Sequence, residues 1–192
     1  MINEDLLLES LHKFYDKPYN SQNLLSILKE DKNISLRSID WFITNYSKKK
    51  NIYYNVYSTP NDTLSFSERN NKLCYNVSVF QSYKSQLRAY SKKRFDPFCR
   101  RNRIKFSCGG ETIDTTIGQL NFFKWAINNL IINYILIHKD EIELDMNTCL
   151  KEMKNNGSLM KKEGKRKKRQ ELSLSATRGL SRSNISVRLE FN

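Results

Sequence analysis

The chain has 192 residues and a formal net charge of +13 at neutral pH. Its apolar share of 39% is below the globular average, but 10 Tyr and 10 Phe supply enough apolar surface for one compact core. Length and composition therefore indicate one domain, or one domain with an arm, and exclude a low-complexity chain.

Helical periodicity dominates the first fifty residues, and we expect residues 1–50 to form a helical N-terminal layer. Apolar residues at helical spacing predict a first helix over 2–15, which Pro18 ends. A short second helix is predicted over 21–30. A third helix, running from about residue 35 to residue 47, has an unusually apolar face.

The period changes after residue 50, and we expect residues 51–156 to form an α+β core. Residues 52–57 and 73–80 are rich in β-branched and aromatic side chains, which predicts an antiparallel pair of strands. Farther along, two short strand-like runs flank Gly109-Gly110, and this pattern predicts a tight hairpin.

The longest helix is predicted over about 116–138, where apolar residues recur at spacings of three and four. A further helix is predicted over about 141–155. We expect a basic flexible loop over 157–183 and a strand over 184–192 that returns to the core. The expected fold class is α+β, with a small antiparallel sheet packed on one long helix, a helical N-terminal layer and a basic loop before a C-terminal strand.

Cysteine spacing and hydropathy limit the possible cofactors and partners. None of the four cysteines forms a CxxC pair, so we expect reduced thiols, no metal and no cofactor. A zinc site built from Cys99, Cys108 and His138 is the weaker alternative, because their spacing matches no common structural zinc module. The longest apolar stretch, Leu130–Ile137, is too short to span a bilayer, so we expect no membrane partner.

Positive charge is concentrated in two short segments. Residues 82–105 carry a net charge of +8 and residues 157–192 carry +7, whereas residues 1–80 carry +1 and residues 106–156 carry −3. Concentrated charge attracts polyanions and raises their encounter rate. The sequence therefore predicts a polyanionic partner, and nucleic acid is the favoured one, DNA more than RNA.

The first candidate interface is the segment 83–101, where basic and aromatic side chains are interleaved, and the ordered basic face is expected over 84–105. A helix over 82–91 would place Lys84, Arg88 and Lys92 on one face. Basic groups neutralise phosphates, and aromatic rings stack on exposed bases. The alternative is a solvated face with core aromatics behind it. The predicted phosphate contacts are Lys84, Arg88, Lys92, Lys93, Arg94, Arg100, Arg101 and Arg103. The predicted stacking residues are Tyr90, Phe95 and Phe98.

The second candidate interface is the basic block at 161–169. Aromatic residues are absent from this block, so any nucleic-acid binding here is predicted to be non-specific and sensitive to salt. A nuclear-targeting signal, an acidic protein partner and a plain solvated loop remain alternatives. The predicted phosphate contacts in this block are Lys165, Arg166, Lys167, Lys168 and Arg169.

Catalytic patterns are scarce, and we expect a protein that is not an enzyme and has no catalytic residues. His12 and His138 have no obvious Cys or Ser partner in the sequence. The remaining enzymatic alternative is a metal-dependent nuclease, which requires several carboxylates at one place. Asp96, Glu111 and Asp114 are the candidates for such a cluster.

Three long stretches, Ser38–Lys49, Tyr83–Arg101 and Thr115–Ile127, resemble an uncharacterised protein found across nucleocytoplasmic large DNA viruses, the giant viruses of protists and algae. The resemblance covers most of residues 35–192. It implies a viral origin and either DNA-associated or structural work. It also implies a location in the virion or in the host cytoplasm at the viral factory, with the nucleus as an alternative.

Taken together, these patterns predict a non-enzymatic basic viral protein that binds nucleic acid through phosphate contacts, largely without sequence specificity. The alternative is a virion structural or assembly protein whose basic segments bind an acidic protein neighbour. The sequence leaves open the oligomeric state and the preference for single or double strands.

Overall fold

The computed structural model describes residues 4–29, 34–61, 63–100 and 102–158. Its last helix, α8 (Lys139–Ser158), continues to the end of the described part, so the first two residues of the expected basic loop are helical. The rest of that loop and the strand expected over 184–192 lie outside the described residues.

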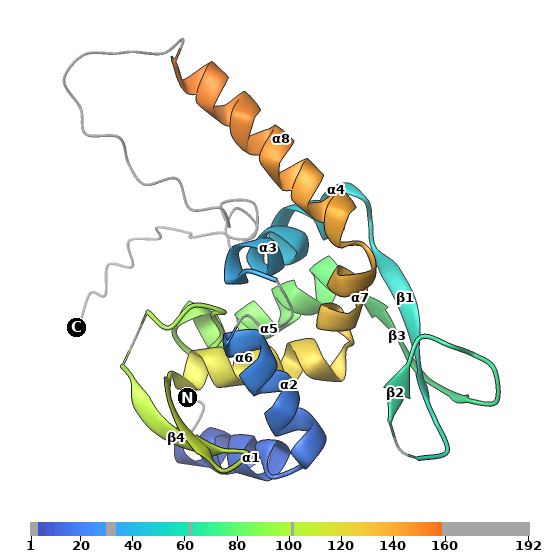
Figure 1. Cartoon of the computed structure of the whole chain (residues 1–192), viewed down its shortest axis with the longest axis vertical. Coiled ribbons are helices and arrows are strands. Elements are labelled where there is room, and N and C mark those ends of the chain that lie inside the picture. Colours follow the sequence, from blue (N-terminus) through green and yellow to red (C-terminus); the bar gives the residue numbers. More distant parts are fainter. Residues whose placement is uncertain (1–3, 30–33, 62, 101, 159–192) are drawn as a thin grey trace, which may run out of the picture.

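Short helices make up the N-terminal part of the molecule (Figure 1). They are α1 (Glu4–Tyr15), α2 (Pro18–Leu28), α3 (Leu36–Trp41), the π-helical turn η1 (Phe42–Tyr46) and α4 (Ser47–Lys49). Pro18 begins α2 rather than ending α1, so the expected start of the second helix at residue 21 is wrong. The first position of a helix suits proline because its backbone N–H needs no partner there.

In the described part of the chain, five strands form two small antiparallel sheets, which confirms the α+β class. The first sheet has the order β2-β1-β3, built from β1 (Tyr53–Ser58), β2 (Leu64–Ser65) and β3 (Lys72–Ser78). The second is the expected hairpin of β4 (Ile104–Cys108) and β5 (Glu111–Thr115). Gly109 and Gly110 close this hairpin with φ values of +58° and +83°. Residues that carry a side chain rarely adopt this backbone conformation.

The single helix expected over 116–138 is two helices, α6 (Ile117–Asn128) and α7 (Ile131–Ile137). Between them Leu130 adopts a left-handed conformation with φ +54°, although its side chain is buried. The Asn129 carbonyl at the break accepts a hydrogen bond from the Tyr54 hydroxyl on β1 at 2.7 Å. Apolar spacing runs across the break without interruption, so the sequence pattern gives no sign of it.

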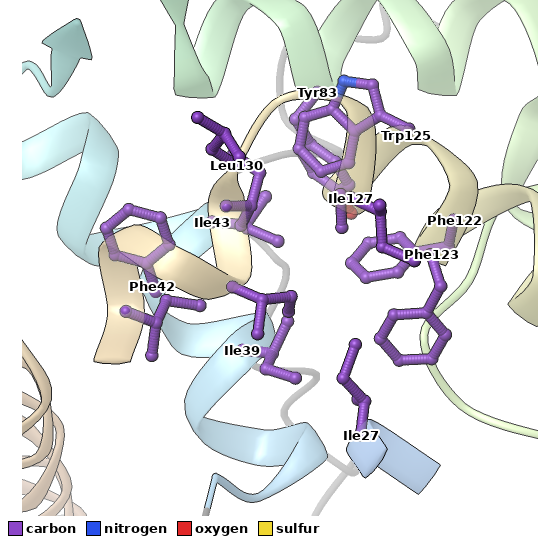
Figure 2. Packing of buried hydrophobic residues seen from close by; sticks show 14 of the residues in the cluster. Ile27, Ile39, Phe42, Ile43, Tyr83, Phe122, Phe123, Trp125, Ile127 and Leu130 are labelled. Carbon is purple, nitrogen blue, oxygen red and sulfur yellow. The ribbon is translucent and has the colours of Figure 1, made fainter. Parts of the chain in front are cut away.

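Helix α6 is the central element of the core. Nine of its twelve residues are buried, on all sides of the helix. Figure 2 shows its aromatic side chains Phe122, Phe123 and Trp125 in the same apolar cluster as Ile39 of α3. The helix α5 (Val79–Arg94) packs along α6, and α8 extends away from the rest of the molecule (Figure 1).

Candidate nucleic-acid interface

Helix α5 carries much of the predicted basic segment. It has no Asp or Glu, and it buries Val79, Tyr83 and Leu87 against the core. Residues 82–90 are helical, with Lys84 and Arg88 one turn apart and Arg88 exposed. The core-facing residues thus fix the helix, and its solvent side presents positive charge without a neighbouring acid in the same helix.

A kink interrupts α5 near its end. Ser91 has φ +57° and ψ 166°, which lies outside the helical region. Lys92 therefore does not continue the helical row of Lys84 and Arg88, and the expectation that all three share one helix face is wrong. Lys93, beyond the kink, is exposed.

The ammonium groups of two lysines from different helices lie over the aromatic ring of Phe80. The Lys84 Nζ lies 5.7 Å from the ring centroid, and the Lys48 Nζ of α4 lies 5.6 Å from it. Both distances are within the range of a cation–π contact. Lys48 thus joins the basic surface of α5. Sequence reasoning missed it, although the run Lys48-Lys49-Lys50 was a visible signal.

The neighbouring Lys49 points to a different partner. Its ammonium group pairs with Asp145 of α8, and this hydrogen bond and the carboxylate charge raise the pKa of the lysine. Adjacent lysines on α4 therefore serve two surfaces, one on α5 and one on the acidic helix α8. The short run Asp140–Asp145 carries four carboxylates and no basic residue, so charge is segregated between the two helices.

Two of the predicted phosphate-binding arginines have carboxylate partners within the chain. The Arg94 Nε donates to the Glu4 carboxylate of α1 at 3.3 Å, and the Arg94 side chain is only 21% exposed. Arg100 donates from Nε and Nη2 to both oxygens of Asp96, at 3.2 and 2.9 Å. Asp96 is therefore an internal counter-ion, and less net charge reaches solvent here than the sequence suggests.

The three predicted stacking aromatics have different environments. Phe95 is 1% exposed and packs against Phe122 and Trp125, so the prediction that it stacks on a base is wrong: its ring belongs to the core. Tyr90 is half-buried and stacks on Phe95 with ring centroids 6.4 Å apart. Phe98 is half-buried, and the guanidinium of Arg100 lies over its ring at 4.5 Å.

Side chains at the start of α6 hydrogen-bond to the backbone of the segment from Arg94 to Arg100. The buried Gln119 side chain donates to the Pro97 carbonyl at 2.9 Å and accepts from the Thr115 hydroxyl at 2.8 Å. Asn121 donates to the Arg94 carbonyl at 2.9 Å. A Cβ on Gly118 would approach the Lys93 carbonyl oxygen to 3.2 Å, so glycine permits this close contact.

Several charged side chains lie close enough to Tyr83 to affect the pKa of its hydroxyl. Burial raises the pKa of its hydroxyl well above the ordinary value, the carboxylates of Asp40 and Asp96 raise it further, and Arg100 opposes the rise. The Tyr83 hydroxyl therefore stays protonated at neutral pH. Its place in the aromatic cluster with Phe95 and Trp125 is that of a core residue.

The carboxylate cluster needed by a metal-dependent nuclease does not form in the described part of the chain. Asp96 pairs with Arg100, and Glu111 pairs with Lys29 at 2.8 Å. Among the residues that the structure describes, no group of three or more His, Cys, Asp or Glu side chains is placed to hold a metal ion. This covers the zinc alternative as well.

A hollow of about 520 Å³ between α1, α2 and the β4–β5 hairpin brings together His12, Asp16 and Cys108. These residue types occur in active sites with a catalytic thiol, but the pKa of this thiol is shifted in the wrong direction for a nucleophile. Burial raises the pKa of Cys108, and its Sγ lies 3.9 Å from the Ser21 carbonyl oxygen, to which it donates. Because the thiolate is the nucleophile, a thiol held in its protonated form is a poor one.

Of the remaining predicted contacts, one is exposed in the described part of the chain and the others lie outside it. Arg103 is exposed just before β4, while Arg101 lies outside the described residues. The same holds for Lys165, Arg166, Lys167, Lys168 and Arg169. In the described ranges, no helix is long and apolar enough to cross a membrane.

Comparison with known proteins shows which protein family the chain belongs to. Residues 2–161 match the model of a family of unknown function (DUF7197). The chain belongs to this family. It is also 41% identical, over 137 residues, to an uncharacterised protein of Acanthamoeba polyphaga mimivirus. The aligned part is 68% of the chain and 48% of the relative, so the chain spans about half the length of the curated relative it matches.

The mimivirus relative confirms the resemblance to giant-virus proteins. No solved structure is significantly similar to the chain.

Proposed function

We propose that this protein binds nucleic acid, DNA more than RNA, by sequence-independent phosphate contacts of a basic surface on α4 and α5. This basic surface consists of Lys48, Lys84, Arg88 and Lys93. The observation that carries the proposal is the acid-free helix α5, whose Lys84 is joined by Lys48 across the Phe80 ring. We expect the protein to act in the virion or at the viral factory in the host cytoplasm.

The contacts within the chain suggest which groups bind phosphate most strongly. Arg94 and Arg100 already have carboxylate partners, so a phosphate that binds them has to compete with Glu4 and Asp96. Arg88 and Lys93 are exposed on a helix without acids and meet no such competition within that helix. Each phosphate that these groups neutralise releases counterions, so binding is expected to weaken steeply with salt.

The direct test is fluorescence anisotropy with labelled DNA and a charge-removing variant of α5. The variant K84Q/R88Q removes two positive charges from the basic surface and is expected to weaken binding by about tenfold, equally for different sequences. The matched control K139Q/K151Q removes two positive charges from the acidic helix α8 and is expected to bind as the wild type does. Equal loss in both variants would refute the proposal, because the effect would then follow net charge alone.

A second candidate function is virion assembly, in which the basic segments bind an acidic protein neighbour, and a separate apolar surface favours an assembly role. Ile137 and Leu144 are 66% and 69% exposed, next to the carboxylates of Asp140 and Glu141. Exposed apolar side chains at the end of α7 and on α8 suit a protein contact better than a nucleic-acid contact. Under this alternative K84Q/R88Q abolishes incorporation into particles while its DNA affinity stays unchanged.

A further inference from the structure

Arg100 and Phe98 form a cation–π pair next to α5. The Arg100 guanidinium carbon lies 4.5 Å from the centroid of the Phe98 ring. The Arg100 side chain is nevertheless 59% exposed. With its guanidinium carbon over the ring and more than half of its side chain exposed, Arg100 lies between Phe98 and the solvent.

Asp96 fixes the orientation of this plane. Its two carboxylate oxygens accept from Nε and Nη2 of Arg100, a fork-to-fork geometry that holds the guanidinium in the plane of the carboxylate. The Asp96 carboxylate is itself largely buried, with 16% of its side chain exposed. The platform is therefore pre-organised and does not depend on a ligand to order it.

The start of α6 anchors the backbone beneath the platform. The Asp96 amide donates to the Gly118 carbonyl at 3.2 Å, and Gln119 holds the Pro97 carbonyl. These bonds bracket the residue that carries the tethering carboxylate. A flat group held in this way pays little conformational entropy when a second flat group stacks on it.

From this geometry we infer that Arg100, backed by Phe98 and tethered by Asp96, is a stacking platform for one unpaired nucleobase, so that the protein prefers single-stranded nucleic acid. The inference rests on the proposed function and names the form of its ligand. In a duplex the base faces are already stacked on one another, so the platform has no partner there. In a single strand an unstacked base can lie on the guanidinium plane.

The pairing with Asp96 also separates this platform from the phosphate contacts of α5. Because the carboxylate offsets the charge of the guanidinium, the contact made by Arg100 is expected to depend on stacking more than on counterion release. Loss of the platform should then lower the affinity for a single strand while leaving the salt dependence of binding nearly unchanged.

The test compares R100K, which keeps the charge but removes the planar group, with the matched control R69K at an exposed arginine between β2 and β3, outside the basic surface. The probes are a labelled short thymidine oligonucleotide and a labelled duplex of similar length, measured by anisotropy. We expect R100K to bind the oligonucleotide about tenfold more weakly, with the duplex affinity within about twofold of the wild type. R69K is expected to change neither by more than about twofold.

A second variant guards against a folding defect in R100K. F98L removes the ring beneath the guanidinium but leaves Arg100 and Asp96 in place, and it should also weaken only the single strand. If R100K and F98L bind both probes as the wild type does, or weaken both equally, the platform is refuted while the proposed function stands. If the wild type binds neither probe at low salt, the proposed function fails and the platform fails with it.

Discussion

The variant Q119L tests whether the start of α6 holds the segment between Arg94 and Arg100. Leucine has nearly the volume of glutamine but makes no hydrogen bond. The substitution removes the bond to the Pro97 carbonyl and the bond from the Thr115 hydroxyl, at 2.9 and 2.8 Å. Gln119 is 2% exposed and Thr115 is fully buried, so water does not replace either bond in the folded protein.

The expected cost follows from the two polar groups left without partners. A buried group that loses its partner costs about 1–3 kcal/mol, and two such groups give about 2–6 kcal/mol. Leucine is less costly to bury than the glutamine amide, and this offsets part of the cost. We therefore expect a loss of about 2–4 kcal/mol in the free energy of unfolding. For a domain of this size, that loss corresponds to a fall in Tm of about 4–16 °C.

Urea denaturation followed by circular dichroism measures this loss, and T115V/Q119L serves as the companion variant. Replacing the Thr115 hydroxyl by a methyl group removes one of the two orphaned groups, so the double variant should recover about 1 kcal/mol relative to Q119L. A loss below about 0.5 kcal/mol for Q119L would refute the reasoning, because it would mean that this network does not hold the segment.

Three further outcomes follow from the same structure. F95A should lower the free energy of unfolding by about 3–5 kcal/mol in urea denaturation, because Phe95 belongs to the core; an unchanged stability would contradict its burial. E4Q releases Arg94 from its carboxylate and should tighten DNA binding by about twofold to fivefold in anisotropy, whereas weaker binding would exclude Arg94 as a contact. Burial, with smaller effects of Tyr134 and Tyr75, raises the pKa of Tyr54 well above its ordinary value of 10.0, so the folded protein keeps a proton that the unfolded chain loses. Stability from this group is therefore complete below pH 10 and falls as the pH rises further. Y54F should cost about 1 kcal/mol at pH 7 through the lost bond to the Asn129 carbonyl, and should show a shallower fall in stability above pH 10 than the wild type.

Local sequence patterns predicted the elements whose causes are local. The Gly109-Gly110 turn and the apolar spacing of α1 each depend on neighbouring residues, and both were predicted from the sequence. The break at Leu130 was not, because a single left-handed residue leaves the apolar spacing intact. Its cause includes contacts distant in the sequence, such as the bond between Tyr54 and the Asn129 carbonyl.

The candidate interface shows the same division. The concentration of charge near α5 was visible in the sequence, but the pairing of Arg94 with Glu4 joins residues ninety positions apart. Phe95 lies in a basic run and is compatible with either an exposed or a core position, and only its packing on Trp125 decides between them. Lys48 reaches the basic surface only because α4 and α5 are neighbours in the fold.

The most direct test of the proposed phosphate contacts is the salt dependence of DNA binding, measured by anisotropy over a series of salt concentrations. Each phosphate contact contributes about 0.7–0.9 to the slope of log affinity against log salt, so K84Q/R88Q should flatten the wild-type slope by about 1.4–1.8. The control K139Q/K151Q should keep the wild-type slope. An unchanged slope in K84Q/R88Q, or a wild type that does not bind DNA at low salt, would contradict the role of α5 as the phosphate-binding surface.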